Sequence, residues 1–461
     1  MQLRNRGRHE PLPAPPGEEG AQGTPWVLLT LPGLALTSVG TLGVGATITV
    51  VGVGLQLVFI AFFARHLAFA ISALHTAPRD LEAEIVDTGF RPSVAVIVAC
   101  KNEEKVIRKL VGSLIALDYP PQLLELIVVN DGSTDRTGEI LTSLATEHAH
   151  LAPLHRSPAE SNGKSGALNA ALARVTADIV IVFDGDHQPR PNVVRRLVRH
   201  FEDPTIAAVQ GRCQISNPGD SLISRLVAID YLAGYLVNEY GRQSIYRLPA
   251  YGGANCAVRT TSVRELGGWN VDSVTEDTDL TIRLTLTGQR VRYDVTAVDE
   301  EEGVITVGRF WRQRYRWARG HQQVWRDYRG LVWRSPIFSW IEKVEMTMFL
   351  LVFHVPVLSG LGLLVLALWG SGVAPAGQDP VNLFLLWTLL LLGPLLELSA
   401  GLLLSRADRR EAPILLFFLP LFLVSIALCA KAWFDGIRGS GYAWGKTSRA
   451  GDAPTAGAVS A

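Results

Sequence analysis

The sequence predicts an α/β domain with a mostly parallel β-sheet, flanked by transmembrane α-helices. Two observations lead to this prediction. Between residues 92 and 300, short β-branched runs alternate with segments of helical spacing, which is typical of a parallel sheet covered on both faces. On either side of this region lie apolar blocks of the length that a membrane-spanning helix needs. The 43 basic and 43 acidic residues balance, which gives no support for nucleic acid as a partner.

Four long apolar blocks surround the polar middle, at residues 26–74, 345–369, 381–404 and 413–435. One such block could be a buried core helix, but several around one polar region favour insertion into a membrane. The first block can hold one or two spans, and it is too long for a signal peptide. The predicted organisation is therefore a disordered tail (1–25), a transmembrane region (26–76), a polar middle domain (90–303), interfacial helices (304–343), a second transmembrane region (344–435) and a tail (436–461).

Arginines between the apolar blocks predict the orientation. The loop 370–379 carries no Lys or Arg, whereas the loop 405–412 carries Arg406, Arg409 and Arg410. Basic loops stay on the cytoplasmic side, so the sequence predicts a multi-pass cell-membrane protein with a cytoplasmic middle domain. The basic tail 436–461 conflicts with a full crossing of 413–435, and Pro420 leaves a re-entrant segment as the alternative. Four or five spans fit the pattern.

Acidic and amide side chains follow three of the predicted strands, "SVAVIVAC" (93–100), "LELIVVND" (124–131) and "ADIVIVFD" (177–184). After any single strand, Asp and Gly are ordinary turn residues. After three strands together they favour a binding site, because ligands of such sheets bind beyond the carboxyl ends of the strands. The side chains in question are Asn102, Glu103, Asp131, Asp184 and Asp186.

The pair Asp184 and Asp186 calls for a positive partner, since carboxylates this close repel one another. Mg²⁺ prefers one or two carboxylates together with phosphate oxygens. Lys164, at the start of the predicted helix in "SNGKSGALNAAL", suits a phosphate, although the segment is not a P-loop and the lysine could equally be solvated. We therefore expect a divalent cation bridged to a nucleotide diphosphate. For His187 a structural role is favoured over a role in the site.

Six motifs in a fixed order resemble glycosyltransferase family 2. They are "VAVIVACKNEE", "VVNDGSTDRT", "GKSGALNAAL", "FDGDHQP", "VTEDTDL" and "RQRYRW". The likeness covers about residues 90–335 and the flanking apolar blocks, and is greatest to the membrane-bound processive branch, with its cellulose, chitin, hyaluronan and poly-N-acetylglucosamine synthases. It implies a nucleotide-sugar-binding, GT-A-like fold, inverting transfer from a UDP-sugar, and Mg²⁺ or Mn²⁺ as cofactor.

The resemblance also implies roles for individual residues. Glu103 and Asp131 would contact the uridine, Lys164 and Asp184 the ribose and diphosphate, and Asp186 the metal. Asp277, beside Glu276 in the TED motif, would be the catalytic base that accepts the proton of the attacking hydroxyl. A helix N-terminus explains the same three residues, and both interpretations can hold at once.

Two further segments belong to the predicted site. Gln313, Arg316 and Trp317 lie on one face of a helix, where the family holds the acceptor and the diphosphate; the alternative is a basic amphipathic helix on lipid. Gly252 and Gly253 permit a ligand to approach the backbone closely, or are simple turn glycines.

The function that the resemblance implies is processive transfer onto a growing polysaccharide, most like poly-N-acetylglucosamine synthesis. The expected partners are a UDP-sugar donor, a polysaccharide acceptor, membrane lipid and accessory export or cell-wall proteins. One alternative is the transfer of one sugar to a lipid or other acceptor. Another is a non-catalytic protein that binds a nucleotide sugar, although Asp186 and Asp277 are both present.

Overall fold

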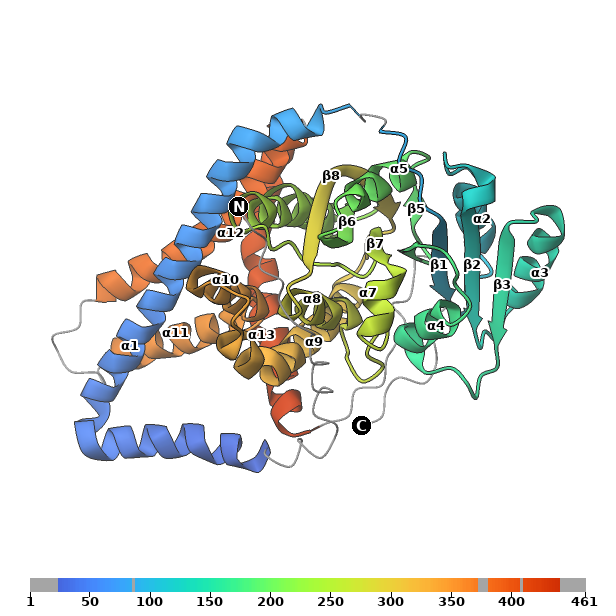
Figure 1. Ribbon diagram of the computed structural model, residues 1–461. Helices are drawn as coiled ribbons and strands as arrows, with labels where there is room; N and C mark the ends of the chain where they lie inside the picture. The colour runs from blue at the N-terminus through green and yellow to red at the C-terminus, as the bar shows by residue number, and fades with distance from the viewer. Residues whose placement is uncertain (1–23, 85–87, 372–379, 407–408, 440–461) are drawn as a thin grey trace, which may run out of the picture.

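A computed structural model describes residues 24–84, 88–371, 380–406 and 409–439. Its centre is an eight-stranded sheet with helices on both faces, beside a group of long helices (Figure 1). The strands are β1 Val94–Cys100, β2 Leu124–Asp131, β3 Leu151–Arg156, β4 Ile179–Asp184, β5 Gln188–Pro189, β6 Ile206–Ile215, β7 Cys256–Arg259 and β8 Arg290–Glu301.

The sheet has the order β3-β2-β1-β4-β7-β6-β8-β5. β1 pairs in parallel with β2 and β4, and β2 pairs in parallel with β3, so the predicted parallel arrangement is confirmed in this half. β7 runs antiparallel to both β4 and β6, whereas β6 and β8 are parallel. The carboxyl ends of β1, β2 and β4 therefore meet at one edge, where the acidic residues were expected.

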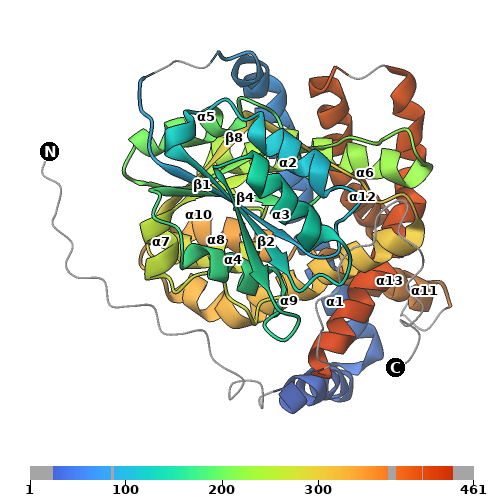
Figure 2. The same cartoon turned by 90° about the vertical axis from the view of Figure 1, so that its right-hand side faces the viewer.

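β1, β2 and β4 are buried on both faces, which explains their almost continuous apolar sequences. On β1, Val94, Val96 and Val98 face a core under α2 Ile107–Ile115, α3 Thr137–Glu147 and α5 Val193–Val198. Ala95 and Ile97 face a core under α4 Gly163–Leu172, α7 Thr260–Glu265 and α8 Glu276–Leu286. Figure 2 shows these two helical layers on opposite sides of the sheet.

The remaining helices connect the sheet domain to the apolar blocks. α6 Leu222–Ala233 continues into two π-helical segments, η4 Gly234–Glu239 and η5 Arg242–Tyr246. α9 Val307–Arg334 precedes α10 Trp340–Leu350, α11 Val355–Gly370, α12 Pro380–Leu404 and α13 Phe418–Ile437, and short 3₁₀ helices cover Pro121–Leu123, Arg199–Glu202 and Arg409–Phe417. α1 Thr24–Leu81 is kinked at Gly43 and lies alongside α12 (Figure 1).

The described helices support fewer membrane crossings than the sequence predicts. Gly43–Leu81 and Glu411–Ile437 are long and apolar enough to cross a membrane. Trp340–Leu350 and Val355–Leu368 make a third candidate only as one pair bent by 75°, and Leu391–Leu404 is short. Among the described residues, the prediction of four or five spans is thus replaced by two, or three with the bent pair. Pro420 lies in the first turn of α13, where proline is tolerated.

The break between α10 and α11 follows from the sequence. Pro356 is the second residue of α11, and a proline disfavours helical backbone at the residue before it and removes one amide donor. Gln322 Nε2 of α9 donates a hydrogen bond to the Phe353 carbonyl at the break (3.4 Å) and another to the Cys429 carbonyl of α13 (3.3 Å). The break is therefore fixed against α9.

Parts of the predicted tails and loops lie outside the described residues. These are residues 1–23 and 440–461, and most of the loop 370–379 that supported the orientation. The cytoplasmic position of the sheet domain and the exact domain boundaries therefore stay predictions.

Candidate active site

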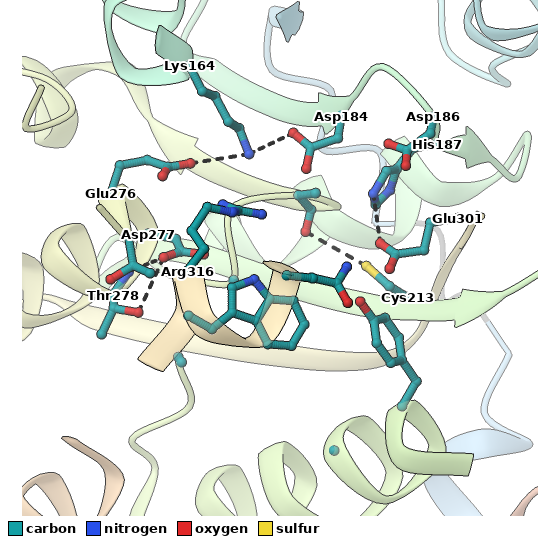
Figure 3. Close-up of a pocket in the computed structure, with 18 of the residues that line it drawn as sticks. Lys164, Asp184, Asp186, His187, Cys213, Glu276, Asp277, Thr278, Glu301 and Arg316 are labelled. Atoms are coloured by element: carbon teal, nitrogen blue, oxygen red, sulfur yellow. Dashed lines mark hydrogen bonds and ion pairs between the residues drawn. The ribbon is translucent and has the colours of Figure 1, made fainter. Parts of the chain in front are cut away.

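One cavity of about 490 Å³ lies at the carboxyl ends of β1, β2 and β4 and extends toward α9 and α10. Figure 3 shows its centre, with side chains from strands and from α9 facing one another. Of the residues predicted for the site, eleven line this cavity: Glu103, Asp131, Lys164, Asp184, Asp186, Gly252, Glu276, Asp277, Gln313, Arg316 and Trp317. The Gly253 carbonyl accepts a hydrogen bond from Lys164, and its Cα lies next to the Asp277 side chain. The structure thus brings the predicted set together; their individual roles remain predictions.

Lys164, at the start of α4, joins two acidic segments. Its Nζ lies 2.6 Å from Asp184 Oδ1 and 3.2 Å from Glu276 Oε1, and it donates to the Gly253 carbonyl at 2.9 Å (Figure 3). Burial disfavours the charged ammonium group, but the negative charges of Asp184 and Glu276 have a larger combined effect and raise the pKa of Lys164. Burial likewise opposes the Asp184 carboxylate, and the Lys164 charge still lowers its pKa. The cavity therefore holds a charged lysine suited to bind a phosphate oxygen.

The surroundings of Asp277 fit the general-base role predicted for it. Its Oδ1 accepts hydrogen bonds from the Thr278 backbone amide at 2.6 Å and from Thr278 Oγ1 at 3.2 Å. Burial, and next the charge of Glu276, raise the pKa of Asp277 to about 6. A base with a pKa near the working pH transfers protons efficiently. The predicted helix N-terminus is also present, because α8 begins at Glu276, although the Thr275 side chain makes no capping hydrogen bond.

We expect Gly253→Ala to impair transfer through Asp277. Gly253 has φ +79°, and a Cβ there would lie 2.7 Å from Asp277 Oδ2. Displacing a catalytic group by about 1 Å can cost about 10²-fold in rate. We expect kcat to fall by about 10²-fold, whereas the affinity for the UDP-sugar donor should stay within about twofold of the wild-type value. Steady-state kinetics measures kcat, and titration with the donor measures the affinity. Gly219→Ala, where nothing lies within 4 Å of the new Cβ, is the control, and equal kcat values for the two variants would contradict this.

Asp131, at the end of β2, lies in a polar pocket at the far end of the cavity. Arg156 Nη1 contacts Asp131 Oδ1 at 2.5 Å, and Ser161 Oγ donates to Asp131 Oδ2 at 2.8 Å. Lys101 Nζ donates to Ser161 at 2.9 Å. Both carboxylate oxygens are thus fixed by neighbours. Sequence reasoning missed Arg156 and Ser161, because their partner lies 25 to 30 residues earlier in the chain.

The metal prediction rests on Asp184 and Asp186, which flank Gly185 at the cavity wall. Carboxylate oxygens at a site that also suits phosphate are the ligand set that Mg²⁺ or Mn²⁺ prefers, so the residues fit such an ion. A second group, His187, Cys213 and Asp299, is close enough to hold a metal. His187 Nδ1, however, bonds Asp299, and its Nε2 lies 2.9 Å from Glu301 Oε2.

The Asp299 and Glu301 carboxylates indicate a structural role for His187. Burial disfavours a charged ring, but Asp299 and Glu301 raise the pKa of His187 well above its usual value. A protonated imidazole has no lone pair for a metal. His187 thus orders the strand end behind Asp186, as the structural interpretation expects.

α9 supplies the wall opposite the strand ends. Gln313, Arg316 and Trp317 all face the cavity, while the Arg314 guanidinium lies 4.1 Å from the Trp317 ring centroid and pairs with Asp230 at 2.5 Å. α9 approaches α8 closely because residue 320 is glycine, where a Cβ would lie 2.2 Å from the Thr275 side chain. The charge of Arg316 lowers the pKa values of both Asp184 and Asp277, after the larger effects given above.

Several cavity residues carry no signal in the sequence. Gln210 of β6 accepts from the Gly252 amide at 2.6 Å and donates to the Ala254 carbonyl at 3.0 Å, so it fixes the glycine segment. The others come from η4, α9, α10 and the α10–α11 break: Tyr235, Asn238, Glu239, His321, Phe349 and Phe353. Each is a common residue type in a helix or strand, and only the fold brings it to the cavity.

The comparison with known families agrees with this geometry. Residues 95–267 match the family described as "Glycosyl transferase family 2". These residues form a glycosyltransferase family 2 domain. The match covers the strand ends that carry Asp131, Asp184 and Asp186, and it stops before Asp277 and α9.

The curated relatives of this family 2 domain include enzymes with two kinds of acceptor. The chain is 38% identical to the "Beta-monoglucosyldiacylglycerol synthase" of Synechocystis sp., over 60% of this chain and 58% of that protein. It is 34% identical to the protein of that name from Nostoc sp., over 62% and 60% of the two chains. Identity is 26% to the "Poly-beta-1,6-N-acetyl-D-glucosamine synthase" of Staphylococcus aureus, over 57% and 60%. The chain spans less than two thirds of each of these relatives.

Among solved structures, the mannosyltransferase PcManGT from Pyrobaculum calidifontis, in complex with GDP-Man and Mn²⁺, has a similar fold. The TM-score is 0.58 at 23% identity, over 84% of this chain and 100% of that chain. This likeness confirms the predicted GT-A-like fold.

Proposed function

We propose that this protein transfers a single sugar from a UDP-sugar to the hydroxyl of a membrane lipid of the diacylglycerol class. The observation that carries the proposal is the identity of 33–38% to three beta-monoglucosyldiacylglycerol synthases, against 26% to poly-N-acetylglucosamine synthases. The relatives thus favour the lipid acceptor over the polysaccharide that the motifs alone suggest. The apolar helices Gly43–Leu81 and Glu411–Ile437 would keep the domain at the membrane that holds such a lipid.

The cavity residues support an inverting displacement. Asp277 accepts the proton of the acceptor hydroxyl, whose oxygen bonds to the anomeric carbon while the bond from that carbon to the diphosphate breaks. Lys164 and Arg316 bind the diphosphate oxygens, where positive groups stabilise the charge that develops. A divalent cation held by Asp186 would supply further positive charge to the leaving group. Glu103 and Asp131 hold the nucleotide end.

Asp186→Asn is expected to raise the Mn²⁺ concentration needed for half-maximal transfer by about 10-fold or more, because removal of one charged ligand weakens a hard-cation site. Mn²⁺ titrations of transfer, and of UDP binding in separate samples, measure the effect. Asp220→Asn, in an exposed turn outside the cavity, is the control. Identical Mn²⁺ dependence in wild type and Asp186→Asn would place the metal elsewhere.

The test of the proposed function uses the full chain in nanodiscs with Mn²⁺. Labelled UDP-glucose, UDP-galactose and UDP-N-acetylglucosamine are offered separately, with and without dioleoylglycerol, and products are resolved by thin-layer chromatography, gels and mass spectrometry. A monoglycosylated lipid that needs dioleoylglycerol, and is absent with Asp277→Asn, supports the proposal. High-molecular-weight product without added lipid would overturn it in favour of the polysaccharide synthase. UDP-sugar binding without any product would favour the binding-only alternative.

A further inference from the structure

The cavity does not end at Asp277. It continues past Trp317 and His321 to Phe349 and Phe353, which belong to α10 and to the α10–α11 break. The nucleotide end, at Asp131, and this aromatic end are thus separate parts of one cavity. The residues at the strand ends are predicted to bind the nucleotide sugar, and no ligand has yet been assigned to the aromatic end.

The aromatic end lies where the apolar helices are interrupted. α10 and α11 are together apolar enough for a membrane span, and they bend by 75° at residues 351–354. The Gln322 hydrogen bond to the Phe353 carbonyl keeps the break against α9. The cavity that holds Asp277 therefore reaches the Phe349 and Phe353 side chains beside this break.

His321 stands between the aromatic end and the base. Its ring lies 5.4 Å from the Phe349 ring and 4.9 Å from the Phe353 ring, centroid to centroid. Its Nε2 lies 3.4 Å from Thr278 Oγ1, which contacts Asp277 Oδ1. Burial, and next the charge of Arg242, lower the pKa of His321 to about 3, so the ring is neutral near pH 7.

The hydrogen bonds assign the tautomer. Thr278 has one hydroxyl proton, and it donates this proton to Asp277. His321 must then donate from Nε2, which leaves Nδ1 as an acceptor. Nδ1 is buried and has no hydrogen-bond partner among the described residues. Because Nδ1 is buried, a ligand in the cavity meets the ring of His321 rather than this nitrogen.

We propose that His321, Phe349 and Phe353 form the acceptor site, which binds the glycerol end of a diacyl lipid that enters at the α10–α11 break. The acceptor hydroxyl loses its proton to Asp277 as its oxygen bonds to the anomeric carbon and the bond from that carbon to the diphosphate breaks, while the glyceryl carbons contact the two phenylalanine rings and the His321 ring. An aromatic wall at a break between apolar helices suits an alcohol with a long apolar body. This inference rests on the proposed function and adds the place and the chemistry of acceptor recognition.

Phe353→Trp tests the aromatic end by narrowing it. We expect the KM for dioleoylglycerol to rise about tenfold or more, since a pocket that differs by a few carbon atoms discriminates by such factors. UDP-glucose affinity should change by less than about twofold, because the nucleotide end is untouched. Phe417→Trp, at an exposed side chain outside the cavity, is the matched control. Equal acceptor KM values for the two variants would overturn the acceptor site.

Photo-crosslinking tests the site without turnover. A diacylglycerol with a diazirine near its glycerol end is irradiated with the full chain in nanodiscs, and labelled peptides are identified by mass spectrometry. The site is supported if residues 345–357 are labelled in the wild type and this labelling falls severalfold in Phe353→Trp. If the wild type shows this labelling but forms no glycolipid, the proposed function fails and the acceptor site stands. Labelling confined to other segments overturns the site, even if glycolipid is formed.

His321→Phe separates the hydrogen bond to Thr278 from the packing of the ring, because it keeps an aromatic ring and removes Nε2. We expect kcat/KM for the lipid to fall about 10-fold or more. The acid limb of the pH–rate profile should also shift, because the hydrogen bonds that connect Asp277 to His321 through Thr278 are interrupted. A wild-type pH profile together with wild-type acceptor KM would contradict a role for His321.

Discussion

Asp277→Asn is expected to reduce kcat about 10²- to 10⁴-fold, which is the usual contribution of a positioned general base. The amide cannot accept the proton of the acceptor hydroxyl, but it keeps the size of the carboxyl group and its contacts with Thr278. Donor binding should change little, since Lys164 still pairs with Asp184 and Glu276. Glycolipid formation and UDP-sugar titration measure the two quantities. Asp272→Asn, an exposed aspartate just before α8, is the control.

The same residue sets the pH dependence. Asp277 acts as a base only when it is ionised, and burial together with Glu276 raises its pKa to about 6. Transfer should therefore increase with pH through about 6 and lose about tenfold for each unit below it. The asparagine variant should lack this limb. A wild-type rate that is flat between pH 5 and 7, with chemistry rate-limiting, would contradict the assignment.

Glu345→Ala should produce the largest loss of stability. The Glu345 side chain is 1% exposed and bonds Arg65 through both carboxylate oxygens, at 2.9 and 2.8 Å, and Arg242 at 3.1 Å. These residues belong to α10, α1 and η5. Removing the Glu345 carboxylate takes away the negative charge that pairs with two buried guanidinium groups. Breaking a buried ion pair in this way lowers the free energy of unfolding by about 3–5 kcal/mol. Thermal unfolding in detergent, followed by fluorescence, measures the loss.

An exposed pair provides the matched comparison. Glu82 contacts Arg406 at 2.5 Å, but both side chains are mostly exposed. Glu82→Ala should cost no more than about 1 kcal/mol, as exposed ion pairs do. Similar unfolding temperatures for Glu345→Ala and Glu82→Ala would show that the buried cluster does not hold the helices together.

Three strands of the parallel half, β1, β2 and β4, could be predicted because they are buried on both faces. β1, β2 and β4 are continuous apolar runs, and each ends at the residues predicted for the site. β3 and β8 mix exposed and buried positions, so their sequences resemble loops or helices. β7 has four residues and is defined by its partners β4 and β6 rather than by its own pattern.

The candidate site divides in a similar way. Residues at strand ends and in the TED and QxxRW motifs could be located, because each motif combines spacing with chemistry. Gln210 and His321 could not, since a single glutamine or histidine has no pattern and its partners are distant in the sequence. Among the described residues fewer spans are found than predicted, in part because composition does not show the 75° bend between α10 and α11, where Pro356 lies.

The composite cavity wall has a consequence for where the functional unit ends. The family match stops at residue 267, yet Glu276, Asp277 and the α9 side chains that complete the cavity follow it, and β8 is the parallel partner of β6. A fragment trimmed to the matched region would keep the strand ends of the candidate site, but it would lack Asp277, the proposed base, and an interior strand. The boundary of the family match therefore falls inside the candidate site, and we expect the helices after it to be needed for activity.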